Sequence, residues 1–410
     1  MKLANQIRTV SIALFICFAA TNASAQVSYE RILNSADEPE NWLTYNGGYK
    51  SQRYSQLDQI TPENVADLKL QWTLQNQVFG AWQSNPIVVD GIMYVTERPN
   101  TVMAVDAITG RVFWKYRHVP AENALICCGA NNRGVAVLDD KVFMGTLDAR
   151  LVAIDRVTGS ALWDVEVGDV DLAYSVTMAP LVVKDKVIVG VGGGEFGIRG
   201  YVAAYDAQTG EEAWKTYTIP GPGEPNHDSW EGDDWQHGGA PVWITGSFDP
   251  ELNLTYWGVG NPGPDWNAGQ RPGDNLYSDS VIALDADTGE LKWHFQFTPN
   301  DAYDYDAVQV PVLADIVWRG TPSKIMMWAN RNGYFYVLDR VTGEFLEGKP
   351  YVTVNWSSGL DANGRPIPTP QPEGMPTFPG NQGGTNWYPP SFSPRTGLFY
   401  FSAWQDYATI

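Results

Sequence analysis

A short tag occurs five times along the chain and limits the folds that the chain can adopt. The tag is an apolar residue, an aspartate, two variable residues and Thr-Gly, followed by a strand-like run that usually reaches a tryptophan, as in AVDAITGRVFWKY. The tag aspartates are Asp106, Asp155, Asp206, Asp285 and Asp339. They are therefore 49, 51, 79 and 54 residues apart. A period of about fifty residues with one long insertion indicates a repeat architecture.

Each repeat contains enough strand-forming sequence for a four-stranded sheet. Asp-x-x-Thr-Gly is a turn sequence, because glycine adopts positive φ and aspartate hydrogen-bonds its own backbone. Alternating runs such as KVFMGTLDARLVAID predict strands and hairpins. The sequence LKLQWTL, around Trp72, predicts one more copy of the tryptophan-bearing strand. We predict an all-β fold, a β-propeller of four-stranded blades with about six blades' worth of sequence, because a β-sandwich does not repeat a tag.

The N-terminal residues have the pattern of an export signal. Lys2 and Arg8 precede an apolar run, and the sequence ASA follows the run. A basic segment, a short apolar core and an A-x-A site are the parts of a secretory signal peptide. We predict a signal peptide over residues 1–25, cleaved after Ala25, and a mature domain over residues 26–410. The apolar run is too short for a permanent membrane anchor, so no membrane span is expected.

Removal of the signal leaves two cysteines, Cys127 and Cys128, which are adjacent. Neighbouring Cα atoms lie about 3.8 Å apart, whereas an ordinary disulfide needs about 4.4–6.8 Å, so a bond between them would close a cramped ring. The alternative is a pair of free, buried thiols. An exported chain meets an oxidising compartment, which favours the disulfide.

Composition and spacing disfavour three kinds of site. The chain has 27 Lys and Arg against 47 Asp and Glu, and nucleic-acid binding needs the opposite charge. The sequence GGGEFG fits a dinucleotide-binding pattern, but a strand sequence follows it where that mechanism requires the N-terminus of a helix. The four histidines are scattered without ligand spacing, so no zinc site is predicted.

Several motifs occur in the order that is typical of one enzyme family. They are the tagged repeats and the sequences CCGANNRGVAV, GGGEFGIRGY, WGVGNPGPDWN with RPGDN, and DAYDYDAV. On these motifs the chain resembles the pyrroloquinoline quinone (PQQ)-dependent alcohol and methanol dehydrogenases, in particular their lanthanide-dependent branch. The resemblance covers essentially the whole mature chain and implies a periplasmic quinoprotein on an eight-bladed propeller. Family members continue beyond AWQDYATI, where this sequence stops, so we expect a C-terminally truncated propeller.

The resemblance implies how PQQ would be held. The Cys127–Cys128 ring would lie against one face of the flat quinone, and Trp243 would stack on the other face. Gln83 stands where the family commonly has glutamate, so it keeps a hydrogen-bonding side chain and loses a charge. Other positions match residues that hold the carboxylates and rim of the cofactor: Arg133, Thr146, Gly193, Gly194 and Asn386.

The resemblance also implies a metal site and a catalytic pair. The implied ligands all offer oxygen atoms, which suits a hard cation: Glu195, Asn261, Asp304 and Asp306. Asp304 resembles the base that accepts the proton of the alcohol, and Arg331 would donate to the quinone carbonyl oxygen. Asp306 is typical of the lanthanide-dependent members, since a trivalent ion is better matched by one more negative donor. We expect one lanthanide(III) ion, with Ca²⁺ as the alternative.

The resulting hypothesis is a PQQ enzyme that oxidises a primary alcohol to an aldehyde. Its electrons would pass to a soluble cytochrome c, since the sequence has no Cys-x-x-Cys-His haem motif. The oligomeric state stays open, with a homodimer as one alternative. Two other functions also stay open: a non-catalytic propeller scaffold of the cell envelope, and a PQQ-dependent sugar or polyol dehydrogenase.

Overall fold

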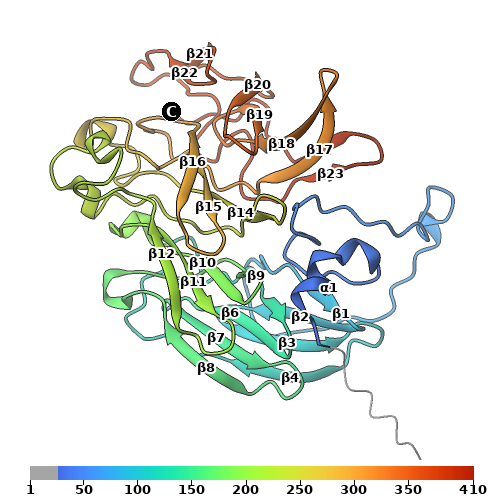
Figure 1. Ribbon diagram of the computed structural model, residues 1–410. Helices are drawn as coiled ribbons and strands as arrows, with labels where there is room; N and C mark the ends of the chain where they lie inside the picture. Colours follow the sequence, from blue (N-terminus) through green and yellow to red (C-terminus); the bar gives the residue numbers. More distant parts are fainter. Residues whose placement is uncertain (1–25) are drawn as a thin grey trace, which may run out of the picture.

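The computed structural model describes residues 26–410, and the predicted signal peptide lies outside the described residues. Among the described residues, five antiparallel sheets of four strands follow one another along the chain. Figure 1 shows the arrangement of these sheets. We call them blades one to five. The predicted all-β propeller of four-stranded blades is confirmed. The sequence expected to form about six blades forms five complete blades and two further hairpins.

The strands of each blade are consecutive in sequence. The blades contain, in order, β1 (Ile87–Val89), β2 (Ile92–Glu97), β3 (Thr101–Asp106) and β4 (Val112–Arg117); β5 (Ala136–Leu138), β6 (Lys141–Gly145), β7 (Arg150–Asp155) and β8 (Ala161–Glu166); β9 (Leu181–Val183), β10 (Lys186–Gly190), β11 (Tyr201–Asp206) and β12 (Glu212–Tyr217); β13 (Ser247–Asp249), β14 (Leu254–Gly258), β15 (Ser280–Asp285) and β16 (Leu291–Gln296); and β17 (Val312–Trp318), β18 (Thr321–Ala329), β19 (Tyr334–Asp339) and β20 (Phe345–Pro350).

Hairpins and short helical segments complete the described chain. The two hairpins are β21 (Ser357–Leu360) with β22 (Pro366–Pro368), and β23 (Ser391–Ser393) with β24 (Leu398–Tyr400). The helical segments are α1 (Tyr29–Leu33) and the 3-10 turns η1 (Ser35–Asp37), η2 (Val65–Asp67), η3 (Val170–Leu172), η4 (Gly194–Phe196), η5 (His227–Ser229), η6 (Asp234–Gln236) and η7 (Ala268–Gln270). Within the described part, no helix has the length and apolar character needed to cross a lipid bilayer.

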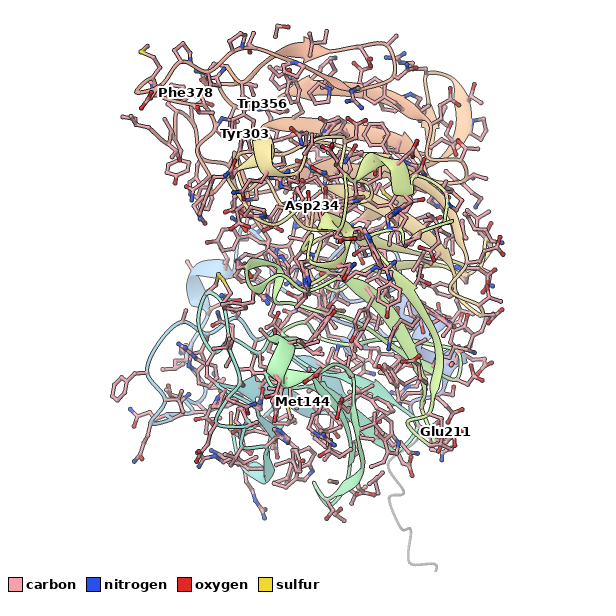
Figure 2. All side chains as sticks on the ribbon, turned by 90° about the vertical axis from the view of Figure 1, so that its left-hand side faces the viewer. Met144, Glu211, Asp234, Tyr303, Trp356 and Phe378 are labelled. Atoms are coloured by element: carbon pink, nitrogen blue, oxygen red, sulfur yellow. A yellow bond between two sulfur atoms is a disulfide. The ribbon has the colours of Figure 1, made fainter. Side chains whose placement is uncertain are left out.

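The core lies within and between the blades. One cluster of buried apolar side chains runs through blades one to four, and a second joins blade four to blade five. Met144 in β6, labelled in Figure 2, is 0% exposed. Packing of one blade against the next therefore stabilises the repeat, since a single blade cannot bury both of its faces alone.

The order of the strands determines where the connections lie. In an antiparallel sheet of four consecutive strands, the second-to-third connection and the exit to the next blade lie at the same end. The third-to-fourth turns, which carry the five tags, lie at the other end. The predicted site residues fall in second-to-third or blade-to-blade connections, except Gln83, which precedes β1, and Asn386, which lies between the two hairpins. The fold therefore brings them to one face, which we call the cavity face, opposite the tags.

The tags join successive blades through their glycines. In the fourth blade Asp285 Oδ1 accepts hydrogen bonds from Asp287 N and Thr288 N, both at 3.0 Å, and forms the predicted turn. Gly289 lies directly beneath the indole of Trp214 from the preceding blade, and Trp214 Nε1 donates to Ala286 O at 3.2 Å. The other tag glycines lie beneath the tryptophans Trp72, Trp114, Trp163 and Trp293. The repeated tag is therefore a contact between blades as well as a turn.

The segment around Trp72 differs from the prediction. It contains no strand, so the expected extra copy of the tryptophan-bearing strand is wrong. A strand requires a hydrogen-bonded neighbour, and the described residues place none beside this segment, where Leu70 is 84% exposed. The tryptophan itself behaves as the repeat predicts, since Trp72 Nε1 donates to Ala107 O at 3.2 Å.

We expect Gly289→Ala to lower the free energy of unfolding by about 2–4 kcal/mol. Gly289 has φ +73°, and a Cβ there would lie 2.5 Å from Trp214 Cε3. Gly91→Ala is the matched control, because Gly91 has φ +75° with nothing within 4 Å of its Cβ position. The control substitution should lower the free energy of unfolding by about 1–2 kcal/mol, because it strains only the backbone. Urea unfolding measures both, and equal losses would show that the tryptophan contact contributes nothing.

Candidate active site

A cavity of about 290 Å³ opens on the cavity face. Its lining comes from connections that are far apart in sequence. They range from the segment before β1, through the connection between β4 and β5, to the segment before β23. Most of the predicted site residues line it: Gln83, Cys127, Cys128, Arg133, Gly193, Glu195, Trp243, Asp304, Asp306, Arg331 and Asn386. Their proximity is a structural fact, whereas their roles toward a cofactor remain predictions.

The remaining predicted residues lie behind this lining. Thr146 is fully buried, and its hydroxyl donates to Asp148 Oδ1 at 2.6 Å. Burial opposes ionisation of Asp148, but hydrogen bonds from His118 and Thr146 lower its pKa to about 2. Asp148 also accepts from Ala121 N at 3.1 Å, so Thr146 supports the segment that leads to the cysteines. Gly194 packs against Pro241, where a Cβ would lie 2.9 Å from the ring.

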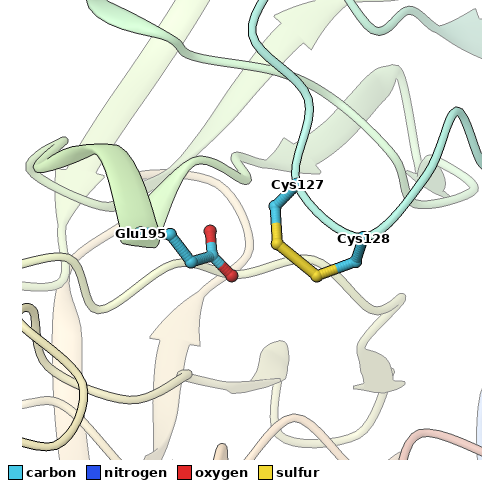
Figure 3. A group of neighbouring side chains, drawn as sticks. All are labelled: Cys127, Cys128 and Glu195. Atoms are coloured by element: carbon cyan, nitrogen blue, oxygen red, sulfur yellow. A yellow bond between two sulfur atoms is a disulfide. The ribbon is translucent and has the colours of Figure 1, made fainter.

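The predicted bond between the adjacent cysteines is present. Cys127 and Cys128 form a disulfide with their Cα atoms 3.8 Å apart. Figure 3 shows the carboxylate of Glu195 beside the two sulfur atoms, all within 4.8 Å of one another. Sulfur atoms in a disulfide are not thiolates, so this trio is not a thiolate metal site. The disulfide instead provides a rigid wall next to an acidic side chain.

Aromatic rings and an arginine form the other side of the cavity. The guanidinium of Arg133 lies 4.8 Å from the ring centroid of Trp243 and 5.2 Å from that of Trp387. Arg133 Nη1 donates to Thr177 Oγ1 at 2.8 Å, and burial lowers the pKa of Arg133 to about 10. Three buried polar atoms at the cavity have no partner among the described residues: Gln83 Oε1, Asn131 Oδ1 and Arg133 Nε. Such atoms indicate a polar ligand, since buried polar groups are almost always hydrogen-bonded.

Arg331 bridges the two carboxylates of the sequence DYD. Its Nη2 donates to Asp304 Oδ2 at 2.9 Å, and its Nη1 donates to Asp306 Oδ2 at 2.6 Å. Asp306 Oδ1 also accepts from Trp243 Nε1 at 3.3 Å and from Asn261 N at 3.1 Å. Asp306 is therefore the centre of a network that joins the arginine, the aromatic wall and the asparagine.

Carboxyl groups outnumber basic side chains in this part of the cavity. Burial, with the nearby carboxylates of Asp306 and Asp265, raises the pKa of Glu195 to about 7. Burial also raises the pKa of Asp304 to about 8, with Arg331 opposing the shift and Asp306 assisting it. These carboxylates are costly to ionise without a further cation. Their oxygen atoms suit a hard metal ion.

The position of Asp304 depends on a residue that the sequence analysis missed. The carboxylate of Asp301 accepts from Tyr303 N at 2.9 Å and from Tyr305 N at 2.8 Å. This turn holds Asp304 in a left-handed conformation at φ 64°. Tyr303 packs against Trp356, with ring centroids 5.5 Å apart. Both residues are labelled in Figure 2. The short spacing of aspartates in DAYDYD was the available signal for such a turn.

Other neighbours of the site also escaped the sequence analysis. They contribute main-chain oxygens, aromatic faces or a second layer of hydrogen bonds rather than a recognisable motif. They are Asn131, Thr177, Asp265, Asn381 and Trp387.

Comparison with known proteins gives the family. Residues 42–355 match the family model described as the β-propeller domain of PQQ glucose, ethanol and alcohol dehydrogenases. The chain belongs to the PQQ-dependent alcohol dehydrogenase family. The match includes every predicted site residue except Asn386.

Individual relatives agree with this membership. A quinohemoprotein alcohol dehydrogenase of Pseudomonas putida is 43% identical, over 97% of this chain and 59% of its own length. A lanthanide-dependent methanol dehydrogenase of Methylacidiphilum fumariolicum is 40% identical, over 90% of this chain and 66% of its own. The solved structure of a europium-containing methanol dehydrogenase has a TM-score of 0.87 and 38% identity, covering 91% of this chain and 70% of its own. The chain thus spans about six-tenths of the first relative's length.

The cavity of this family member fits the cofactor that the family name implies. PQQ is flat and carries several carboxylates, and the cavity offers a disulfide wall, an indole and a buried guanidinium with an unpartnered Nε. The carboxylate-rich side, with Glu195, Asp304 and Asp306 in the lining and Asn261 behind it, hydrogen-bonded to Asp306, fits a metal ion bound by oxygen atoms.

Proposed function

We propose that the protein is a periplasmic, PQQ-dependent alcohol dehydrogenase that oxidises a primary alcohol to an aldehyde. The proposal rests on one observation: the disulfide, Trp243 and the Arg331-bridged carboxylates line a single cavity. We further propose that residues 26–410 act as one domain after removal of the signal peptide. A soluble cytochrome c would accept the electrons, and a homodimer would be the assembly.

When bound, PQQ supplies the two-electron acceptor for the alcohol and the metal ion supplies a Lewis acid. The chain holds and orients the reactants. Trp243 and the Cys127–Cys128 pair form flat walls for a planar group, and Arg133 offers a donor to a carboxylate. Gln83, Gly193 and Asn386 border the same space, and Thr146 and Gly194 support it from behind.

Asp304 accepts the proton of the alcohol in this proposal. Its Oδ2 accepts from Arg331, which leaves Oδ1 for the hydroxyl of the substrate. Arg331 keeps its positive charge, because its burial is offset by the carboxylates of Asp306 and Asp304 and its pKa is raised. It therefore orients the base and stabilises the negative charge that develops beside it.

The metal would be a lanthanide(III) ion, with Ca²⁺ as the alternative. Glu195, Asn261 and Asp304 would be ligands in either case. Asp306 would distinguish the lanthanide from Ca²⁺ through its charge. Both of its oxygens already accept hydrogen bonds, from Arg331, Trp243 or Asn261. A trivalent ion needs the negative charge of Asp306 more than a divalent ion does.

We expect dye-linked alcohol oxidation by PQQ-loaded protein with La³⁺, and a loss of about 10²-fold or more in the Asp306→Asn variant. Asparagine keeps the shape of the side chain, so the test removes a charge and spares most of the hydrogen bonds. Activity with Ca²⁺ alone, unaffected by Asp306→Asn, would contradict the lanthanide assignment. No activity with either metal and no retained quinone would favour a propeller scaffold.

A further inference from the structure

A carboxylate outside the implied ligand set controls the orientation of one implied ligand. Asp265 Oδ1 accepts a hydrogen bond from Asn261 Nδ2 at 2.9 Å. The second amide hydrogen of Asn261 faces Pro262 O at 3.4 Å. Among the described residues, no donor reaches Asn261 Oδ1. The amide therefore presents its oxygen, and not its nitrogen, to other partners.

Hydrogen bonds hold the backbone of Asn261 on both sides, so the orientation of its side-chain amide depends on the contacts of the amide itself. Asn261 N donates to Asp306 Oδ1 at 3.1 Å, and Asn261 O accepts from Ala240 N at 3.0 Å. Rotation of the amide by half a turn would exchange an oxygen for an NH₂ group at almost no steric cost. A carboxylate can only accept hydrogen bonds, so Asp265 permits one of the two orientations.

Asp265 is itself held in place by a buried arginine. Arg271 is 1% exposed, and it donates to Asp265 O at 3.1 Å and to Pro264 O at 3.3 Å. Its Nη1 donates to Asn275 Oδ1 at 2.9 Å. Arg271 also donates to Asp301 O, in the turn that carries Asp304. The segment with Asn261 and the segment with Asp304 are thus tied together through one side chain.

We propose that Asp265 is a positioning residue of the metal site, which turns the oxygen of Asn261 toward the cation. This inference rests on the metal site of the proposed function. An amide facing a cation with its NH₂ group would repel it, since that group carries partial positive charge. Partners that orient metal ligands typically change metal affinity by about 10–100-fold when they are removed.

The test measures La³⁺ binding directly, by equilibrium dialysis of the PQQ-loaded protein against a metal buffer. We expect Asp265→Ala to weaken binding by about 10–100-fold. Asp265→Asn should lose binding as well, but no more than Asp265→Ala, because its amide can accept from or donate to Asn261 and therefore permits both orientations. Glu231→Ala is the matched control, since Glu231 is an exposed carboxylate outside the cavity lining, and its affinity should not change.

A double variant separates positioning from simple charge. If Asp265 acts through Asn261, Asp265→Ala combined with Asn261→Ala should bind no more weakly than Asn261→Ala alone. Additive losses, or wild-type binding by Asp265→Asn, would overturn the positioning role. Unchanged binding in Asp265→Ala would overturn it as well. Absence of La³⁺ binding by the wild type would instead overturn the proposed metal site.

Discussion

Asp304→Asn is expected to lower kcat for alcohol oxidation by about 10²–10⁴-fold while the protein stays folded and keeps its PQQ. Asparagine preserves the shape of the side chain and an oxygen that accepts from Arg331 Nη2, which Asp304 Oδ2 does at 2.9 Å. It cannot accept the proton of a hydroxyl group. Steady-state rates with saturating PQQ and metal give the effect, and quinone absorbance gives the cofactor content.

The control for this substitution is Asp287→Asn. Asp287 accepts from Lys184 Nζ at 2.8 Å in the fourth tag, at the end of the blades opposite the cavity. We expect its kcat to equal that of the wild type. An Asp304→Asn protein that turns over at the wild-type rate would place the base on another residue. A variant without bound quinone would show that Asp304 is needed for cofactor retention instead.

Arg331→Met is expected to lower the free energy of unfolding of the metal-free protein by about 3–5 kcal/mol. Arg331 is 3% exposed and pairs with Asp304 at 2.9 Å and with Asp306 at 2.6 Å. Methionine fills similar space but leaves two carboxylates without a cationic partner. Arg331→Lys keeps the charge and should fold, but one ammonium group cannot reproduce the fork that bridges both carboxylates and Asn381 O.

A surface pair provides the comparison for Arg331. Arg365 donates through both of its terminal nitrogens to Asp274, at 2.8 and 2.7 Å, with half of its side chain exposed. Arg365→Met should lower the free energy of unfolding by about 0–1 kcal/mol, which is the usual contribution of an exposed ion pair. Urea unfolding of the metal-free variants measures both losses. Equal losses would mean that the cavity already admits enough water to solvate Asp304 and Asp306.

The repeat in the sequence predicted most of the fold. The five tags mark the five complete blades, since each tag lies between the third and fourth strands, whereas the sequence was expected to form about six blades. The strand near Trp72 was wrong, because strand formation depends on a neighbour that local sequence does not specify. Its tryptophan still contacts Gly110, because that contact needs only an indole and a bare glycine.

The motifs predicted most of the cavity lining but not the layer behind it. Cys127, Cys128 and Asp304 stand out through unusual local sequences. Asp265 has no such signal, because its effect depends on the direction of a hydrogen bond to Asn261. Thr146 donates to Asp148 behind the cavity lining, and its predicted contact with the cofactor stays a prediction.

The separation of the tag turns from the cavity face has a practical consequence for coupling the protein to a surface. The tag turns expose residues such as Ile108, at 79%, and Val157, at 72%, which contact neither the cavity nor the blade core. A single cysteine placed there would tether the molecule to an electrode with its reactive opening facing solution. The five tag turns offer five alternative anchoring points.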